Sequence, residues 1–288
     1  MAWNPERLNN PLYLVVTDLD GSLLDHHTYR YDAARPVLDL LEQMRIPVVL
    51  ASSKTRAEIL ALRADMGNEH PFIVENGAAV LIPTGYFPRP PADIAERDGF
   101  WVRELAPPRA HWLPILHELR GAMPGAFQDF ASADLDALID MTGLSAPAAA
   151  LARQREYTEP VQWRGSEADR AAFVERLRGA GATVWRGGRF YSVGGDSDKG
   201  AALKWLRGQY ALAAGTAAVY DLAVGDGPND VPMLEAAHHA LLIPAAQRQL
   251  PQLARDTNVI VGRGRGPQAW AWGVGEWLRG LYRAPEEL

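Results

Sequence analysis

Two aspartates that follow an apolar stretch are the residues of this chain best placed to do chemistry. Asp18 and Asp20 come directly after Leu12-Tyr-Leu-Val-Val-Thr17, whose apolar, β-branched character is typical of a buried strand. In a parallel α/β sheet, ligands bind beyond the carboxyl ends of the strands, so both carboxylates would project into a site. Two carboxylates that lie close together repel each other, and a bound divalent cation usually offsets this repulsion. The alternative is a plain strand end with one capping and one turn aspartate.

A second acidic strand end lies near the carboxyl terminus, where Gly225-Asp-Gly-Pro-Asn-Asp230 follows the apolar run 219–224. The glycines let the backbone turn sharply, and Asp226 offers a hard oxygen ligand, with Asn229 or Asp230 as a further ligand or its orienter. Capping of the next helix by Asn229 or Asp230 is the alternative. Capping does not explain why Asp226 stands at the same kind of position as Asp18.

Two further positions could bind an anion. Ser52 and Ser53 end the apolar run 47–51 and open a helix, where hydroxyls and backbone N–H groups make a ready anion site. Lys199 stands at the start of another helix, and its ammonium could hold a phosphate and a carboxylate together. The alternatives are N-capping by one serine and a solvated surface lysine.

The elements that position these residues alternate between strands and helices. Apolar strands are predicted at 12–17, 47–51, 72–75 and 79–82, with a tight turn at 76–77, and amphipathic helices at 35–44 and 56–66. The same rhythm resumes with a helix from 199, strands at 219–224, 240–243 and 259–261, and a closing helix at 268–282. This alternation predicts an α/β fold with a doubly wound parallel sheet.

The rhythm is interrupted in the middle of the chain. Residues 86–108 are rich in proline and glycine and indicate a linker or long loop. Beyond it we expect helices near 110–120, 133–141, 145–154 and from 166, with strands at 157–163, 183–185 and 189–193, the last two around a turn at 187–188. We therefore predict an inserted α+β cap domain at 86–195, between two core segments, 1–85 and 196–288.

Composition excludes several classes. The 288 residues contain no cysteine, which excludes a disulfide framework, a thiol nucleophile and a cysteine-ligated zinc site. A net charge of -6 argues against a nucleic-acid or membrane-surface partner. No apolar run reaches the roughly 18 to 20 residues of a membrane span, and the first eleven residues lack the apolar centre of a signal peptide. We expect a cytoplasmic protein; its oligomeric state is not indicated.

Taken together, the four stretches resemble the haloacid dehalogenase-like phosphatases in residue type, order and strand-end placement. The resemblance implies that Asp18 is the nucleophile that takes the phosphoryl group and that Asp20 is the general acid and then the base. It implies that Ser52 and Lys199 hold the phosphate. It further implies that Mg²⁺ is held by Asp18, the backbone carbonyl of Asp20 and Asp226, and we add Asp230 as a candidate ligand.

A finer resemblance covers nearly the whole chain. Asp25-His-His-Thr-Tyr29, Ser53-Lys-Thr-Arg-Ala-Glu58, Phe72-Ile-Val-Glu-Asn-Gly-Ala78 and Arg155-Glu-Tyr-Thr-Glu-Pro160 are similar to stretches of the mannosyl-3-phosphoglycerate phosphatases. In that family the cap lies over the site and selects the sugar phosphate. By this analogy the candidate substrate-binding residues are Ser53, Asn76, Arg155, Glu156, Arg189 and Asn229.

We therefore expect a Mg²⁺-dependent phosphatase that acts on a small phosphorylated glycoside acid such as mannosyl-3-phosphoglycerate, through an aspartyl phosphate. Another sugar phosphatase, for glucosyl-3-phosphoglycerate or sucrose phosphate, stays open. So does a phosphomutase, which would return the phosphoryl group to sugar. A non-catalytic binding protein is disfavoured because every motif residue is present.

Overall fold

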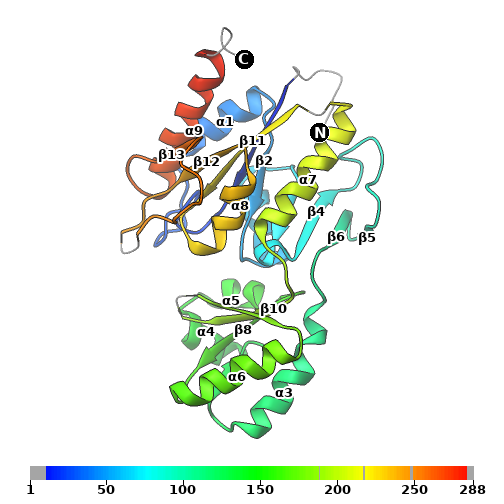
Figure 1. The fold of residues 1–288 in the computed structure, drawn as a ribbon, viewed down its shortest axis with the longest axis vertical. Coiled ribbons are helices and arrows are strands. Elements are labelled where there is room, and N and C mark those ends of the chain that lie inside the picture. Colours follow the sequence, from blue (N-terminus) through cyan, green and yellow to red (C-terminus); the bar gives the residue numbers. More distant parts are fainter. Residues whose placement is uncertain (1–10, 188, 217, 247–248, 284–288) are drawn as a thin grey trace. The chain divides into compact units, whose positions relative to one another are not determined.

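The computed structural model describes residues 11–187, 189–216, 218–246 and 249–283 (Figure 1). Contacts divide the chain into two units. The first contains residues 1–52, 68–103 and 198–288, and the second contains residues 53–67 and 104–197. The second unit is thus an insertion that also takes in the helix after the second strand. Its boundaries differ from the 86 and 195 expected for a cap.

One mixed sheet, dominated by parallel pairs, forms the centre of the first unit, as expected for an α/β protein (Figure 1). Its described strands stand in the order β13-β12-β11-β1-β2-β3-β4-β6-β5. The strands from β13 to β3 pair in parallel. Their bounds are β1 Leu12–Thr17, β2 Val48–Ala51, β3 Phe72–Val74, β11 Val219–Gly225, β12 His239–Leu242 and β13 Val259–Val261.

The central strands are buried because helices lie on both faces of the sheet. Every residue of β2 is buried, and in β1 all but Tyr13 are. The chain passes from β1 through α1 (Arg35–Gln43) to the neighbouring strand β2. It also passes from β11 through α8 (Val231–Ala236) to β12, which lies in the opposite direction along the sheet. Right-handed crossovers in opposite directions put α1 and α8 on opposite faces. Helix α9 (Gly266–Arg283) packs against α1, and α7 (Lys199–Ala214) packs against α8.

The far edge of this sheet contains the predicted turn at 76–77 and the predicted strand at 79–82, but its strands are antiparallel. The chain turns through a 3-10 segment, Glu75–Gly77, into β4 (Ala79–Pro83), which pairs antiparallel with β3. Residues 86–108 are not simply a loop, because they contain the antiparallel pair β5 (Ala95–Arg97) and β6 (Phe100–Glu104). The residues of β5 are exposed, so they lack the apolar pattern by which a strand is recognised.

The second unit is an α+β unit around its own sheet, with the strand order β7-β8-β10-β9 and antiparallel pairing. An apolar cluster that includes Trp112, Leu116, Phe173 and Leu177 packs α3 and α6 against this sheet. A second cluster joins α4 and α5. The bounds are α2 Arg56–Met66, α3 Leu113–Ala122, β7 Phe127–Asp129, α4 Leu135–Thr142, α5 Ala146–Ala152, β8 Glu159–Trp163, α6 Glu167–Gly179, β9 Thr183–Arg186 and β10 Tyr191–Gly194. The turn expected between β9 and β10 includes Gly188, which lies outside the described residues.

Within the described ranges, no single helix has the length and apolar character needed to cross a membrane. One bent pair, α4 with α5, meets those two criteria jointly.

Candidate active site

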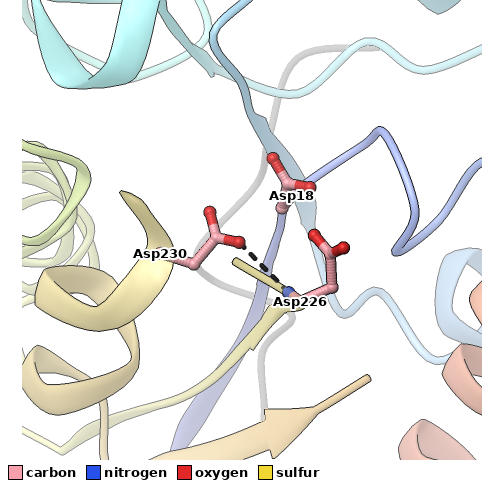
Figure 2. A group of neighbouring side chains, drawn as sticks. All are labelled: Asp18, Asp226 and Asp230. Atoms are coloured by element: carbon pink, nitrogen blue, oxygen red, sulfur yellow. Dashed lines mark hydrogen bonds between the residues drawn. The ribbon is translucent and has the colours of Figure 1, made fainter. Parts of the chain in front are cut away.

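The two acidic strand ends lie side by side, at the carboxyl ends of neighbouring central strands of the large sheet. Strands β1 and β11 are parallel neighbours with Thr17 opposite Val224, and the Asp18 backbone N–H donates to the Val224 carbonyl at 2.8 Å. This register carries Asp18 and Asp226 past the ends of adjacent strands. Figure 2 shows their side chains together with Asp230, which precedes α8. One carboxylate oxygen of each aspartate lies within 4.8 Å of the others.

Lys199 joins two of these carboxylates. Its Nζ donates to Asp18 Oδ1 at 2.6 Å and to Asp230 Oδ1 at 2.7 Å. The side chains of Lys199 and Asp230 are fully buried, and Asp18 is 5% exposed. Lys199 is therefore a buried ammonium at the start of α7 and not a solvated surface charge.

Asp230 is occupied on both oxygens. Besides Lys199, it accepts hydrogen bonds through Oδ2 from the backbone N–H groups of Asp226 at 3.1 Å and Gly227 at 3.0 Å, the first of which is drawn in Figure 2. These bonds close the turn between β11 and α8. Of the two roles expected for Asp230, they favour the orienting one over direct ligation of a metal.

Close approach of the two acidic loops requires a glycine after Asp20. Gly21 has φ of +88°, and a Cβ at this position would lie 2.7 Å from Asp226 Oδ2. A side chain there would meet both the steric penalty of a positive φ and the Asp226 carboxylate. The Asp-x-Asp-Gly order of the sequence is thus a requirement of the geometry as well as of the chemistry.

The site carries excess negative charge. Burial first, and then the negative charges of Asp230 and Asp226, raise the pKa of Asp18 to about 8, although Lys199 acts in the opposite direction. Burial would lower the pKa of Lys199, but Asp18 and Asp230 outweigh burial and raise it. One ammonium thus stands among three carboxyl groups. This donor set of hard oxygens with unbalanced charge fits a divalent cation, which would lie among Asp18, Asp226 and the turn after Asp18.

Ser52, Asn76 and Asn229 are connected within the same unit. Ser52 is 1% exposed at the end of β2, and its backbone N–H donates to the Ile73 carbonyl at 3.1 Å. The Ser52 carbonyl accepts from the Asn76 N–H at 2.9 Å, and the Asn229 side-chain amide donates to Asn76 Oδ1 at 3.3 Å. Asp20 is half-buried, two residues beyond Asp18. The structure therefore places these predicted residues after β1, β2, β3 and β11, at the carboxyl edge of the sheet.

The remaining candidates belong to the second unit. Arg155 donates from Nε to Thr158 Oγ1 at 3.0 Å and from a terminal nitrogen to the Ser53 carbonyl at 2.8 Å. Glu156 pairs with Arg56 at 3.0 Å. Arg189 is exposed, with its guanidinium carbon 6.0 Å from the centre of the Phe190 ring.

The sequence did not indicate which side chains support the backbone at Asp18. The Thr17 hydroxyl donates to the Asp18 carbonyl at 2.7 Å and accepts from Trp270 Nε1 at 2.9 Å. Trp270 is fully buried on α9, more than 250 residues away along the chain, where it reads as an ordinary core residue. The sequence shows only that a threonine directly precedes Asp18, and this does not indicate that Trp270 is its hydrogen-bond partner.

Comparison with known proteins accords with this arrangement. A model of the haloacid dehalogenase-like hydrolases matches residues 15–86. The glucosyl-3-phosphoglycerate/mannosyl-3-phosphoglycerate phosphatase of Methanococcoides burtonii is 35% identical over 263 residues, which cover 90% of this chain and 94% of that one. This chain belongs to the mannosyl-3-phosphoglycerate phosphatase family of haloacid dehalogenase-like hydrolases. It is a phosphoric monoester hydrolase, as the sequence resemblance implied.

Solved structures support the fold of this family member. A protein from Geobacillus kaustophilus has a TM-score of 0.65 at 15% identity, covering 93% of this chain and 99% of its own. The sucrose-phosphatase of Synechocystis, solved with sucrose and phosphate, has a TM-score of 0.57 at 14% identity, covering 94% and 98%. These likenesses confirm the α/β architecture.

Replacing Lys199 should damage this phosphatase in two ways. In Lys199→Met, two buried carboxyl groups lose their cation, so we expect a stability loss of about 3 to 5 kcal/mol in addition to loss of turnover. Urea unfolding and phosphate release measure the two effects. Lys204→Met is the matched control, because Lys204 is exposed on the same helix and should change stability by no more than about 0.5 kcal/mol. Equal stability of the two variants would contradict the buried ion pair.

Proposed function

We propose that this phosphatase hydrolyses mannosyl-3-phosphoglycerate to mannosylglycerate and phosphate, with Mg²⁺ and through an aspartyl phosphate. The observation that carries the proposal is the buried Lys199 between Asp18 and Asp230, next to Asp226. It supplies a carboxylate, a fixed ammonium and a cation-binding set of oxygens at one strand edge. The name of the Methanococcoides burtonii relative supports the choice of substrate and gives glucosyl-3-phosphoglycerate as the alternative.

In the first step an Asp18 carboxylate oxygen attacks phosphorus, and the bond from phosphorus to the substrate oxygen breaks. Asp20 protonates that leaving oxygen. In the second step water attacks the aspartyl phosphate, Asp20 takes the water proton, and Asp18 is released with inorganic phosphate. The Lys199 ammonium, 2.6 Å from Asp18, and the Ser52 hydroxyl hold the phosphoryl oxygens through both steps.

A bound Mg²⁺ would offset the charge of the phosphate and the carboxylates and so let the two anions approach. Asp18, Asp226 and the backbone after Asp18 are the groups that would hold it.

The second unit is proposed to select the substrate, with Arg189 and Glu156 recognising the glycerate carboxylate or the sugar hydroxyls. A cytoplasmic location stays a prediction.

A panel of phosphate monoesters, assayed with Mg²⁺ and with excess chelator, tests the proposal. We expect free phosphate to be released from mannosyl- and glucosyl-3-phosphoglycerate far faster than from sucrose phosphate, and activity to vanish with the chelator and return with Mg²⁺. Labelled substrate separates hydrolysis from transfer. Accumulation of an isomeric sugar phosphate in place of free phosphate would indicate a phosphomutase, and full activity in chelator would rule out the metal.

The two aspartates should be separable by substitution. Asp18→Asn should abolish turnover with the fold intact, because an amide is nearly isosteric but a very poor nucleophile. Asp20→Asn should reduce the rate by about 10² to 10⁴, the usual contribution of a general acid and base. Rapid-quench assays and mass spectrometry of the phosphorylated enzyme measure both effects. Near-native rates in Asp18→Asn would end the covalent mechanism.

Arg189 should affect glycoside acids selectively. A guanidinium can pair bidentately with a glycerate carboxylate. If that pair is buried when substrate binds, Arg189→Ala should lose roughly 30- to 800-fold in kcat/KM on mannosyl-3-phosphoglycerate. Hydrolysis of p-nitrophenyl phosphate, which has no carboxylate, should hardly change. Arg186→Ala, another exposed arginine of the same unit, is the control. Equal losses on both substrates would exclude recognition of the acid by Arg189.

A further inference from the structure

The segment after Ser52 is fastened to the second unit by three contacts. The Thr55 hydroxyl donates to the Leu151 carbonyl at 3.0 Å, and Arg56 pairs with Glu156 at 3.0 Å. The third contact is the hydrogen bond from Arg155 to the Ser53 carbonyl at 2.8 Å. Helix α2 also packs on α5. Residues 53–67 are thus part of the second unit by contact, although they directly follow a strand of the first.

The division between the units falls at the peptide bond between Ser52 and Ser53, in the loop that the proposed function assigns to the phosphate. Ser52 is the last residue of its segment in the first unit, fixed to β3 by its backbone N–H. Ser53 is the first residue of the second unit. The backbone of Ser52 is held on one side by its own bonds, from its N–H to the Ile73 carbonyl and from the Asn76 N–H to its carbonyl. On the other side it is held through Ser53, whose carbonyl accepts a hydrogen bond from Arg155. Arg155 is the side chain seen to hold the Ser53 carbonyl.

The guanidinium of Arg155 is itself oriented. Its Nε donates to Thr158 Oγ1 at 3.0 Å, and Thr158 is 1% exposed, directly before β8. A planar guanidinium with one N–H fixed by a buried hydroxyl presents its other N–H groups in a set direction. An ammonium has no such fork, so lysine could reach either Thr158 or the Ser53 carbonyl with a point charge but could not reproduce both bonds.

We propose that Arg155 is a positioning residue of the phosphate loop and not a reader of the glycerate acid. It acts through Ser53 on Ser52, which is assigned to the phosphoryl group under the proposed function, so the inference rests on that function. Arg155 then serves every phosphate monoester that this enzyme hydrolyses, whatever group is attached to the phosphate. Under this proposal Arg155 contributes to phosphate binding, in place of the substrate selection expected from the sequence.

The test compares Arg155→Ala and Arg155→Lys with wild type on p-nitrophenyl phosphate and on mannosyl-3-phosphoglycerate. We expect kcat/KM to fall about 10- to 100-fold on both, since a small displacement of a binding group has an effect of this size. The inhibition constant of inorganic phosphate should rise. Arg155→Lys should restore little. The control is Arg164→Ala, whose guanidinium bonds the Gln162 side chain in the same unit and should leave both rates near wild type.

A double-mutant cycle with Ser52→Ala distinguishes positioning from general support of the fold. If Arg155 acts through Ser52, the double variant should be no slower than Ser52→Ala alone, whereas independent effects would multiply. Thr158→Val adds a milder variant, since it removes the hydroxyl that orients Arg155 while Ser53 keeps its partner. Thr158→Val should lose less kcat/KM than Arg155→Ala on both substrates. If Arg155→Ala does not fold, Thr158→Val takes its place in the double-mutant cycle.

Two outcomes overturn the inference. One is an Arg155→Ala enzyme with a full rate on p-nitrophenyl phosphate and a loss confined to the glycoside acid. The other is multiplicative losses in the cycle. Failure of the proposed function looks different, because the wild-type enzyme would then release no phosphate from either glycoside acid. Its rate on p-nitrophenyl phosphate would still report on Arg155.

Discussion

The burial of one ammonium among carboxylates fixes where the elements that carry the candidate site meet. Lys199 is fully buried and is stable as a cation because Asp18 and Asp230 each accept a hydrogen bond from it. Those partners come from different elements, so the end of β1 and the starts of α7 and α8 must meet at one point. At Gly200 a Cβ would lie 2.2 Å from the Pro232 carbonyl oxygen, so the approach of α7 to α8 depends on this glycine.

Asp230 transmits this constraint to the cation-binding side of the site. One of its oxygens bonds Lys199, and the other accepts from the backbone N–H groups of Asp226 and Gly227. The same carboxylate thus fixes the ammonium and shapes the turn that carries Asp226. A carboxylate oxygen of Asp226 lies within 4.8 Å of one of Asp18, so these two aspartates are candidate ligands for a divalent cation.

The sequence predicted the parts of the fold that have a local signature. Apolar, β-branched runs ending in polar residues located β1, β2, β3 and β11, and parallel pairing then brings Asp18, Ser52 and Asp226 to one edge. The pair β5 and β6 escaped because β5 is exposed and lies in a segment rich in proline and glycine. The role of Trp270 could not be predicted for another reason. Its hydrogen bond to Thr17 joins elements from opposite ends of the chain, and no local sequence pattern indicates such a contact.

Arg155 and Arg189 show why the type of a residue in the sequence does not predict the contacts of its side chain. Both are arginines of the second unit, and from the sequence both were expected to bind substrate. What separates them is that Arg155 is bonded to a backbone carbonyl, a group that every residue has and that no motif can specify. That carbonyl matters because it follows Ser52 directly, at the point where the chain passes from one unit to the other. Ser52 and Ser53 are joined by a peptide bond, so a side chain that holds the Ser53 carbonyl also restrains the residue proposed to bind phosphate.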